Sequence, residues 1–413
     1  MRVLVIASAY PTPRRPSFGL PVHYWVRHIA HHCPVVVLAP IPWFPFNRWL
    51  RGPERAEAPF LDTRDGLLIY YPRFLSVPAL LKCLDGLFCF LCLLPLVAWL
   101  RLRSPFDLID AHFSYPGGVA AVLLGKTFRR PAITTLRGSH DIRHASYRLR
   151  RFQISFVLYN AARVIAVSDS LRQFASELGT PPEHIRVIRN GVDASRFKPG
   201  DRGHARRALD LPVNSTILLS VGNLVEGKGH HRVLELLPRL LERTPTLLYV
   251  AIGAHVPGDA YPQLLHRLVD QHRLHDHVRI LSVRPHHEIP LWMAAANLFC
   301  LATRMEGWCN ALTEALACGL PVITTRVGGN TELVTEGRDG FLVSFWDASG
   351  FAEAIIRALE ITWNVAEISE RARVHGWERT AEQVFAEFVR CGEGYTSRSR
   401  RPAKSHSTRV DNW

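Results

Sequence analysis

One stretch, Ile217-Leu-Leu-Ser-Val-Gly222-Asn223-Leu-Val-Glu-Gly227-Lys228-Gly229, joins an apolar run to a glycine-rich turn, and a helix is expected from His230. A short apolar run that ends at glycine is typical of a buried strand. Glycines let a backbone approach a phosphate, and Lys228 supplies positive charge for a leaving group. A solvated lysine in a turn is the alternative. A strand that leads through such a turn into a helix is the unit of an open α/β sheet.

The same alternation of apolar runs and helix-like stretches covers most of the 413 residues. The predicted strands are Val3 to Ala9, Val35 to Ala39, Leu108 to Ala111, Ala132 to Thr135, Val164 to Val167, Ile217 to Val221, Leu247 to Ile252, Val278 to Leu281, Leu298 to Leu301 and Pro321 to Thr325. Continuous apolar runs are typical of parallel strands that are buried on both faces. Their alternation with helices predicts an α/β fold of two Rossmann-like, doubly wound parallel sheets.

A boundary between two domains is predicted where the pattern restarts, after Gly191 to Gly203. We expect an N-terminal domain at residues 1–195 and a C-terminal domain at 196–376. Ligands bind at the carboxyl ends of strands in open sheets, so the site should lie in the cleft between the domains. The tail, residues 394–413, is rich in Ser and Arg and is expected to be disordered.

A second stretch, Glu306-Gly-Trp-Cys-Asn310-Ala-Leu-Thr-Glu314-Ala-Leu-Ala-Cys-Gly319-Leu-Pro321, reads as loop, helix, stop and strand. We expect Asn310 as the N-cap and Gly319 just after the helix. Unpaired amides and the helix dipole favour an anion such as a diphosphate near Cys309 to Leu312. Glu306 and Glu314 can then accept hydrogen bonds from sugar hydroxyls. For an isolated pair at this spacing, a dipole-stabilising role of Glu314 would be the preferred explanation.

Together these segments resemble family 4 of the retaining glycosyltransferases, which have the GT-B fold, over nearly the whole chain. The matching segments are the N-terminal loop ending at Gly19, Asp107 to Phe113, Thr135 to Ser139, Ala162 to Ser168, Val187 to Asp193, Gly222 to Gly229, Glu306 to Pro321 and Val327 to Glu332. They occur in the order and spacing of the family. Residues 377–393 resemble the terminal helix that returns to the N-terminal domain.

The resemblance implies a role for each matching residue. Glu306 would contact the transferred sugar, Glu314 the ribose and Lys228 the diphosphate. The predicted catalytic residues are Glu306, His112 and Lys228, with His112 in a loop after a strand, near the reacting centre; a packing role for His112 is the alternative. The predicted donor-binding residues are Gly19, Gly222, Asn223, Lys228, Val283, Arg284, Glu306, Gly307, Trp308, Cys309, Asn310, Ala311, Leu312 and Glu314.

Three positions depart from the family pattern. Asn223 stands where many members have an arginine that shares the diphosphate charge, and Arg137 stands where many have a histidine. The turn at Gly253 lacks the second glycine of a common Gly-x-Gly motif. None of these changes touches the two glutamates, so the resemblance still implies catalysis.

The implied reaction moves a sugar, with retention and without a bound metal, from a nucleotide-diphosphate sugar to a hydroxyl of a glycan, lipid-linked or other acceptor. UDP- or GDP-sugars are the expected donors, no other cofactor is expected, and cell-surface polysaccharide or glycoconjugate synthesis is the expected setting. The chain has no Asp-x-Asp motif, in agreement with this expectation. The alternatives are a GT-B nucleotide-sugar epimerase and a non-catalytic nucleotide-sugar-binding partner of a polysaccharide assembly complex.

The net charge of +14 lies entirely in the first half of the chain. Residues 1–200 contain 26 Lys and Arg against 12 Asp and Glu, whereas the remainder contains 24 of each. Such a basic half attracts anionic lipids or acceptors, although solvated surface is the alternative. Nucleic acid is not expected as a partner, because no RRM, KH or zinc-finger signature accompanies the charge.

The longest apolar segment, Gly86 to Leu100, has fifteen residues without a charge and is interrupted by Pro95. A spanning helix needs ~20 apolar residues, so we expect this segment to lie either in a membrane interface or under the fold. The first apolar run is read as a strand and not as a signal peptide. Most of the eight cysteines lie in apolar runs, as buried thiols do. We therefore expect a cytoplasmic protein, with peripheral contact at the inner face of the membrane as an option.

Overall fold

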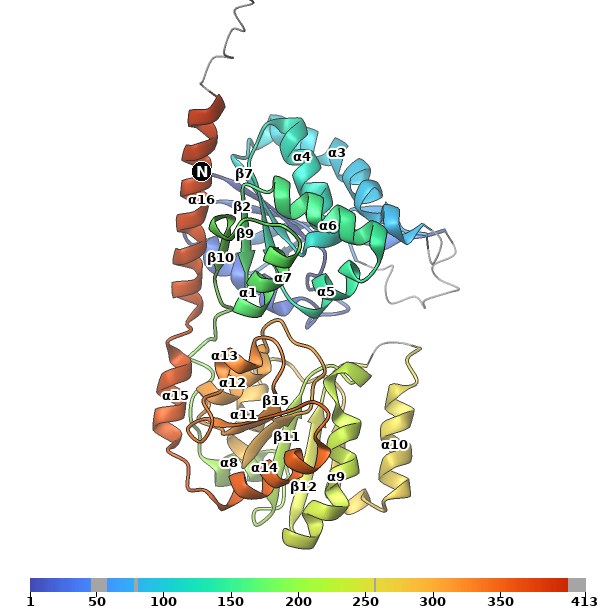
Figure 1. The fold of residues 1–413 in the computed structure, drawn as a ribbon, viewed down its shortest axis with the longest axis vertical. Coiled ribbons are helices and arrows are strands. Elements are labelled where there is room, and N and C mark those ends of the chain that lie inside the picture. The colour runs from blue at the N-terminus through green and yellow to red at the C-terminus, as the bar shows by residue number, and fades with distance from the viewer. Residues whose placement is uncertain (46–57, 78–80, 256–257, 400–413) are drawn as a thin grey trace, which may run out of the picture.

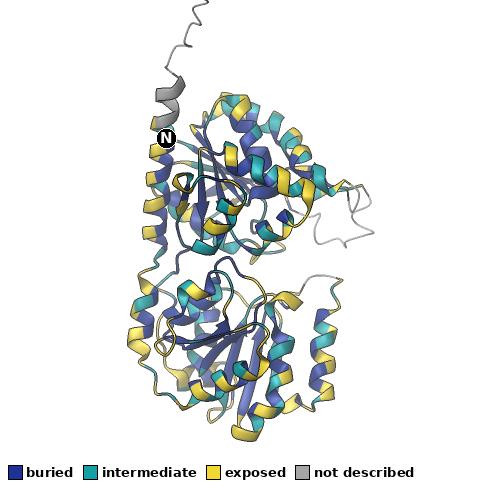
Figure 2. Ribbon diagram, in the orientation of Figure 1, coloured by how far each residue is buried: buried dark blue, intermediate teal, exposed yellow. Residues whose placement is uncertain are grey.

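The protein consists of two α/β units, one above the other along the long axis of the molecule (Figure 1). This architecture comes from a computed structural model that describes residues 1–45, 58–77, 81–255 and 258–399. The first unit contains an eight-stranded sheet and the second a six-stranded sheet. Apolar side chains from both faces of each sheet form the cores (Figure 2). The predicted pair of doubly wound sheets is confirmed.

The N-terminal sheet has the strand order β10-β9-β8-β7-β1-β2-β5-β4. Its strands are β1 (Val3–Ala7), β2 (Val35–Leu38), β4 (Leu61–Arg64), β5 (Leu67–Tyr70), β7 (Leu108–His112), β8 (Ala132–Leu136), β9 (Arg163–Ala166) and β10 (Ile185–Val187). All neighbours in it pair in parallel except β4 and β5, which are antiparallel. Two further strands, β3 (Ile41–Trp43) and β6 (Arg73–Leu75), form a small parallel sheet.

The C-terminal sheet is parallel throughout, in the order β13-β12-β11-β14-β15-β16. Its strands are β11 (Thr216–Val221), β12 (Leu247–Ile252), β13 (Val278–Leu281), β14 (Leu298–Leu301), β15 (Val322–Thr325) and β16 (Gly340–Val343). The predicted boundary at residue 195 falls between the last strand of the first sheet and the first strand of the second. Its exact position stays a prediction.

Helices cover both faces of the two sheets (Figure 1). The N-terminal unit has α1 (Leu20–Ile29), α3 (Asp85–Arg103), α4 (Val119–Phe128), α5 (Ser139–Ala145), α6 (Arg148–Asn160) and α7 (Asp169–Glu177). The C-terminal unit has α8 (Arg202–Ala208), α9 (His230–Arg243), α10 (Tyr261–Gln271), α11 (Ile289–Ala295), α12 (Asn310–Ala317), α13 (Asn330–Leu333), α14 (Ala348–Glu360) and α15 (Val365–Arg373). Helix α3 continues through Pro95, which does not interrupt it.

The last described helix, α16 (Trp377–Ser399), crosses back and lies along the N-terminal unit (Figure 1). Trp377 stacks on His28 of α1, with ring centroids 5.9 Å apart. The carboxylate of Glu387 pairs with Arg163 at 3.1 Å. The helix runs past residue 393, so the expectation of disorder from 394 onward is wrong for 394–399. The remaining tail, 400–413, lies outside the described residues.

In both sheets the order of the strands reverses at one point, the topological switch point. In the C-terminal sheet this point lies between β11 and β14, which are neighbours in space but distant in sequence. Gly222 directly follows β11, and the loop that contains Glu306 follows β14. The crevice at the carboxyl ends of strands beside a switch point is where open sheets bind ligands. The fold therefore brings the two most informative sequence segments together.

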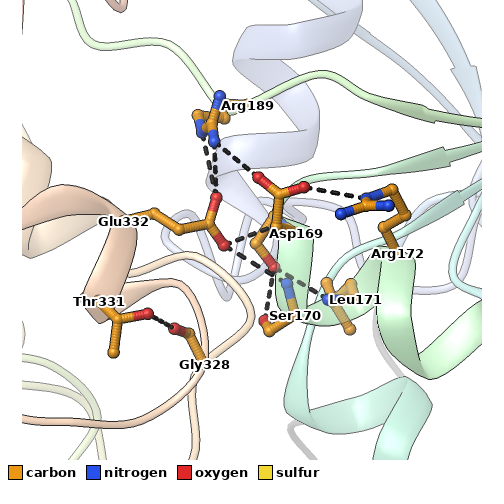
Figure 3. A network of polar contacts seen from close by, with 9 residues as sticks. Asp169, Ser170, Leu171, Arg172, Arg189, Gly328, Thr331 and Glu332 are labelled. Atoms are coloured by element: carbon orange, nitrogen blue, oxygen red, sulfur yellow. Dashed lines mark hydrogen bonds and ion pairs between the residues drawn. The ribbon is translucent and has the colours of Figure 1, made fainter.

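A polar network joins the two units on one side of the cleft (Figure 3). Glu332 of α13 accepts a hydrogen bond from the backbone N–H of Asp169 at the start of α7, at 2.8 Å. The same carboxylate accepts one from Arg189 at 2.8 Å, and Arg189 also pairs with Asp169 at 3.0 Å. Because the partners come from both units, this network favours the closed arrangement of the domains.

Candidate active site

A pocket between the two units is lined by residues from both of them. Its lining residues are Ser17, Leu20, Pro21, Tyr24, Val221, Gly222, Asn223, Ile252, Gly253, Ala254, Val283, Arg284, His286, Ile289, Asn310, Ala311, Glu314 and Trp377. Seven of the predicted donor-binding residues are among them: Gly222, Asn223, Val283, Arg284, Asn310, Ala311 and Glu314. Residues from six separate segments of the sequence thus meet in one pocket.

The N-terminal wall of this pocket is the loop before α1. Ser17 and Leu20 line the pocket on either side of Gly19. Gly19 has φ 70°, and a Cβ at this position would lie 2.4 Å from the carbonyl oxygen of Ala9. Only glycine fits this left-handed, crowded position. Gly19 thus shapes the loop, while its neighbours form the pocket surface.

Lys228 and Glu306 form an ion pair next to the pocket. Lys228 Nζ lies 2.5 Å from Glu306 Oε1, which also accepts a hydrogen bond from the Thr303 hydroxyl at 3.0 Å. The lysine stem passes over Gly222, since a Cβ on that glycine would lie 3.6 Å from Lys228 Cδ. Burial alone would lower the pKa of Lys228, but the Glu306 carboxylate more than offsets it and holds that pKa above its ordinary value. Lys228 is therefore charged at neutral pH.

Glu314 is held by a chain of hydrogen bonds that crosses between the units. His286 Nε2 lies 2.9 Å from Glu314 Oε1, and His286 Nδ1 lies 3.0 Å from the Tyr24 hydroxyl. Arg196 donates to that hydroxyl at 3.4 Å. A carboxylate can only accept, so the neutral His286 tautomer that satisfies this chain has its proton on Nε2 and accepts from Tyr24. Burial raises the pKa of Tyr24, which keeps the phenol protonated as the donor.

Helix α12 directs its first turn at the pocket. The structure has Cys309 as the N-cap and Asn310 as the first helical residue, so the prediction of Asn310 as the N-cap is wrong by one position. The Asn310 side chain instead accepts a hydrogen bond from Asn190 of the N-terminal unit at 2.9 Å. The first turn of a helix presents amides without intrahelical partners, and Asn310 and Ala311 line the pocket from that turn. This end can therefore interact with an anion.

The remaining predicted residues of this segment support the pocket from behind. Trp308, Cys309 and Leu312 are buried in the core. A Cβ on Gly307 would lie 2.2 Å from Gly138 Cα, so the backbones of the two units are in close contact at this glycine. Burial raises the pKa of the Cys309 thiol to about 12, so it is not a nucleophile at neutral pH.

His112 does not reach the pocket. It is the last residue of β7, not part of the following loop, and its side chain is fully buried. Its Nδ1 accepts a hydrogen bond from Arg137 at 2.7 Å, and its Nε2 lies 3.3 Å from Asp110. Burial lowers the pKa of His112, so the ring is neutral. The expectation that His112 lies in the loop after the strand is wrong, because β7 continues through it. Its role near the reacting centre stays a prediction.

Arg137 connects this buried histidine to the cleft. Its guanidinium lies 4.0 Å above the Trp25 ring and donates to the Asn190 side-chain oxygen at 2.7 Å. Asn190 in turn donates to Asn310, which lines the pocket. Burial lowers the pKa of Arg137 to about 9, so the side chain stays protonated at neutral pH. Arg137 is therefore linked to the other domain through Asn190.

Eleven of the eighteen lining residues were not predicted from the sequence, and three of these have aromatic rings: Tyr24, His286 and Trp377. Histidine is frequent in this chain, with 20 copies, so composition does not single out His286. Its position five residues after the end of β13, in the same loop as Val283 and Arg284, was the available signal. Among the residues that the structure describes, no group of three or more His, Cys, Asp or Glu side chains could hold a metal ion.

Comparison with solved structures identifies the fold. HepE from Anabaena, crystallised with UDP, superposes with a TM-score of 0.72 at 22% identity, covering 94% of this chain and 100% of that one. Sucrose-phosphate synthase from Thermosynechococcus elongatus superposes with a TM-score of 0.78 at 19% identity, covering 95% and 100%. These are GT-B glycosyltransferases, so the expected GT-B architecture is confirmed.

Comparison of sequences identifies the family. Residues 22–196 match the model for Glycosyltransferase Family 4, and residues 201–375 match the model for Glycosyl transferases group 1. D-inositol 3-phosphate glycosyltransferase 2 of Catenulispora acidiphila is 31% identical over 297 residues, covering 67% of this chain and 69% of the relative. A D-inositol 3-phosphate glycosyltransferase of Kribbella flavida is 28% identical over 308 residues, covering 70% and 72%. The chain belongs to the group 1 glycosyltransferases of family 4.

Proposed function

We propose that this glycosyltransferase takes its sugar from a nucleotide-diphosphate donor, retains the anomeric configuration and needs no metal ion. The observation that carries this proposal is the interdomain pocket itself. Gly222 and Glu314 line it, and the Lys228–Glu306 ion pair lies beside it. A lysine and a helix N-terminus can stabilise the negative charge that develops on a departing diphosphate, a task that a divalent cation performs in other enzymes.

Each part of the pocket suits one part of such a donor. The diphosphate fits between Gly222, Lys228 and the first turn of α12, where backbone and positive charge are available. Glu314 would accept hydrogen bonds from the ribose, and Glu306 from the transferred sugar. The backbone near Val283 and Arg284 would hold the base. When the diphosphate binds, Lys228 would lie between two anionic partners, the phosphate and Glu306.

In the proposed reaction, the bond between the anomeric carbon and the diphosphate oxygen breaks, and a bond from that carbon to the acceptor oxygen forms. The acceptor attacks from the face of the leaving group, which preserves the configuration. Its proton passes to a phosphate oxygen of the departing nucleoside diphosphate. Closure of the two domains excludes water and protects the donor from hydrolysis.

A panel of nucleotide sugars tests the donor class. HepE has been crystallised with UDP and with UDP-glucose, so we expect a UDP-sugar to raise the melting temperature of this protein most, with GDP-sugars as the second class. Incubation of the best donor with acceptors, followed by NMR of the anomeric proton, would reveal retention. A new epimeric nucleotide sugar formed without acceptor would identify an epimerase, and binding without turnover a non-catalytic partner.

We also propose that the acceptor carries a phosphate or a similar anionic group. The relatives are named as D-inositol 3-phosphate glycosyltransferases. Near the cleft-facing edge of the N-terminal unit, His144 Nδ1 lies 3.1 Å from Arg150, and His140 and His144 lie 3.2 Å apart. The pKa of His144 is lowered to about 3, first by burial and then by His140, Arg150, Lys82 and Arg143. A bound anion would relieve the repulsion in this cluster.

Paired acceptors test this acceptor class. A polyol phosphate and the same polyol without phosphate would be compared as acceptors with the best donor. We expect the phosphorylated acceptor to have the lower KM, and Arg150→Ala to remove most of that preference. Equal KM values for both acceptors in the wild-type protein would contradict the anionic acceptor class without affecting the donor proposal.

A cytoplasmic location with peripheral membrane contact is part of the same proposal, as is a role in polysaccharide or glycoconjugate synthesis. All eight cysteines lack disulfide partners, and six of them are buried. Free buried thiols are common in proteins of reducing compartments. Detection of the protein in the cytoplasmic and membrane fractions of lysed cells, and not in the medium, would support this location.

A further inference from the structure

Helix α3 presents an apolar side to solvent. Its inner side, with Cys89, Leu93 and Val97, is fully buried in the N-terminal core. Its outer side carries large apolar residues of which 43 to 85% is exposed: Leu87, Leu91, Trp99 and Leu102. Monomeric soluble domains seldom leave a connected row of large apolar side chains uncovered. The outer side of α3 therefore needs an explanation.

Among the described residues, the segment Lys82–Arg103 is the one helix that is long and apolar enough to cross a membrane, but only a third of it is buried in the fold. Its inner side packs on α4 and β6 as part of the core. A folded N-terminal domain cannot release this helix into a bilayer without exposing that core. The exposed outer side is instead suited to lie along a surface.

Helix α6 has an apolar outer side as well. Leu149, Phe152 and Tyr159 are 65, 74 and 72% exposed, and they recur at helical spacing. The middle of α6 contacts the turn before α3, where the Gln153 side chain donates to the Cys83 carbonyl at 2.7 Å. Exposed residues are visible along the outer sides of both helices in Figure 2. We call these seven residues of α3 and α6 the outer apolar surface.

The charge around the outer apolar surface is almost entirely positive. Residues 81–163 contain 12 Lys and Arg, no Glu and 4 Asp, a difference of 8 out of the net +14 of the chain. Three of the four aspartates, Asp85, Asp110 and Asp141, are buried. Arg101 and Arg103 adjoin Leu102 in the sequence, Arg148 and Arg151 adjoin Leu149 and Phe152, and Arg103 lies 5.4 Å above the Trp99 ring. The segment thus combines apolar and cationic groups on one part of the molecule.

We propose that the outer apolar surface docks on an anionic lipid bilayer. A surface with both apolar and cationic side chains suits the interface of a membrane. There the apolar side chains can enter the boundary of the acyl region, while the cationic groups remain among the lipid headgroups. Each Lys or Arg near an anionic surface adds to the electrostatic attraction, and this attraction becomes weaker as the salt concentration rises. The core of a protein–protein interface, in contrast, is depleted of charged residues. The charge pattern therefore favours a lipid surface over a second protein.

This docking does not depend on the donor chemistry, because none of the seven residues lines the interdomain pocket. It would hold the N-terminal unit at the membrane while the C-terminal unit stays in solution. An acceptor anchored in lipid would then meet the enzyme at a surface and not by diffusion in three dimensions. The proposal concerns the protein's location and can be tested without knowing either substrate.

Co-sedimentation of the full chain with vesicles tests the proposal. We expect binding to vesicles that contain phosphatidylglycerol, little binding to pure phosphatidylcholine, and a loss of binding as salt concentration rises. The double variant Leu102→Ser, Phe152→Ser removes the most exposed residue of each helix. It should weaken binding at least ~10-fold, because the two side chains can no longer insert.

Trp346→Ser is the matched control, since Trp346 is 79% exposed but belongs to the C-terminal unit. It should bind vesicles as the wild type does, and all variants should keep the wild-type melting temperature and turnover of a soluble acceptor. Equal vesicle binding by the double variant and the wild type would overturn the proposal. So would a concentration-dependent dimer that the double variant abolishes, because the surface would then be covered by a second copy.

Discussion

The two glutamates of the proposed donor site are held in different ways. Glu306 has its partners, Lys228 and Thr303, within the C-terminal unit, and the pair with Lys228 is 2.5 Å long. Glu314 is held by His286, whose other ring nitrogen bonds to Tyr24 of the N-terminal unit at 3.0 Å. One carboxylate is therefore positioned by a single domain, whereas the position of the other depends on how the two domains meet.

This difference has a consequence for the order of events. The Lys228–Glu306 half of the site should persist when the domains separate, and should be ready when a donor arrives. The Glu314 half becomes complete only when Tyr24 is in reach of His286. Donor binding and domain closure should therefore be coupled through Glu314 and not through Glu306. The following variants test this contrast, from the largest expected effect to the smallest.

Lys228→Ala should leave a folded protein in which kcat for sugar transfer is at least ~100-fold lower, the size of effect typical for the loss of one electrostatic stabiliser. The lysine is charged at neutral pH, so its removal takes away positive charge beside the departing diphosphate. Steady-state kinetics measures the change. Lys126→Ala, at an exposed lysine of the N-terminal unit, is the control, and wild-type turnover in Lys228→Ala would contradict the assigned site.

Glu314→Ala should lower kcat/KM for the donor by at least ~100-fold, because the pocket loses its charged acceptor of hydrogen bonds. Its melting temperature without donor should change little, since Glu314 lies at the pocket surface. Donor titration by isothermal calorimetry measures the loss in binding. If the variant bound donor as tightly as the wild type, the ribose role of Glu314 would be wrong.

His286→Phe should raise the donor KM ~10-fold while kcat changes less, because a hydrogen bond to a charged group contributes ~1.5–3 kcal/mol. The ring would still fill the space but could not orient Glu314. His286→Gln offers an amide N–H in place of Nε2–H and should recover part of the lost affinity. An unchanged KM in His286→Phe would show that Glu314 needs no positioning by the histidine.

Tyr24→Phe should have the smallest effect, a rise of ~3-fold in donor KM, because a neutral hydrogen bond contributes ~0.5–1.5 kcal/mol. The variant removes one atom and leaves the packing of Tyr24 against Trp377 in place. Small-angle scattering with donor present would measure whether closure is weakened. A compact, wild-type-like complex with unchanged KM would mean that the domains close independently of this contact.

Much of the fold follows from local patterns in the sequence. Ten apolar runs correspond to ten of the strands, and several, such as Leu247–Ile252, have the predicted ends. The strands that the pattern missed are mostly short edge strands, such as β4, β10 and β16. Edge strands bury less of their surface, so their hydrophobic pattern is weaker. Pro95 was read as an interruption of the apolar segment, whereas helix α3 continues through it in the structure.

The site was predicted in part. Gly222, Glu306 and Glu314 belong to motifs that can be recognised from the sequence. In the structure Gly222 and Glu314 line the pocket, and Glu306 pairs with Lys228 beside it. His112 was placed in a loop because a sequence does not reveal where a strand ends. In the structure β7 includes His112, and Arg137 donates hydrogen bonds to both His112 and Asn190.

The amino-acid sequence by itself determined where the strands lie and which segments carry glycines, glutamates and the lysine, because these features depend on neighbours a few residues away. Only the tertiary structure decided which of those groups become partners. Tyr24 and His286 are 262 residues apart in the chain and come together because two separately folded sheets face each other. Such a contact is a property of domain packing, for which no local pattern in the chain provides a signal.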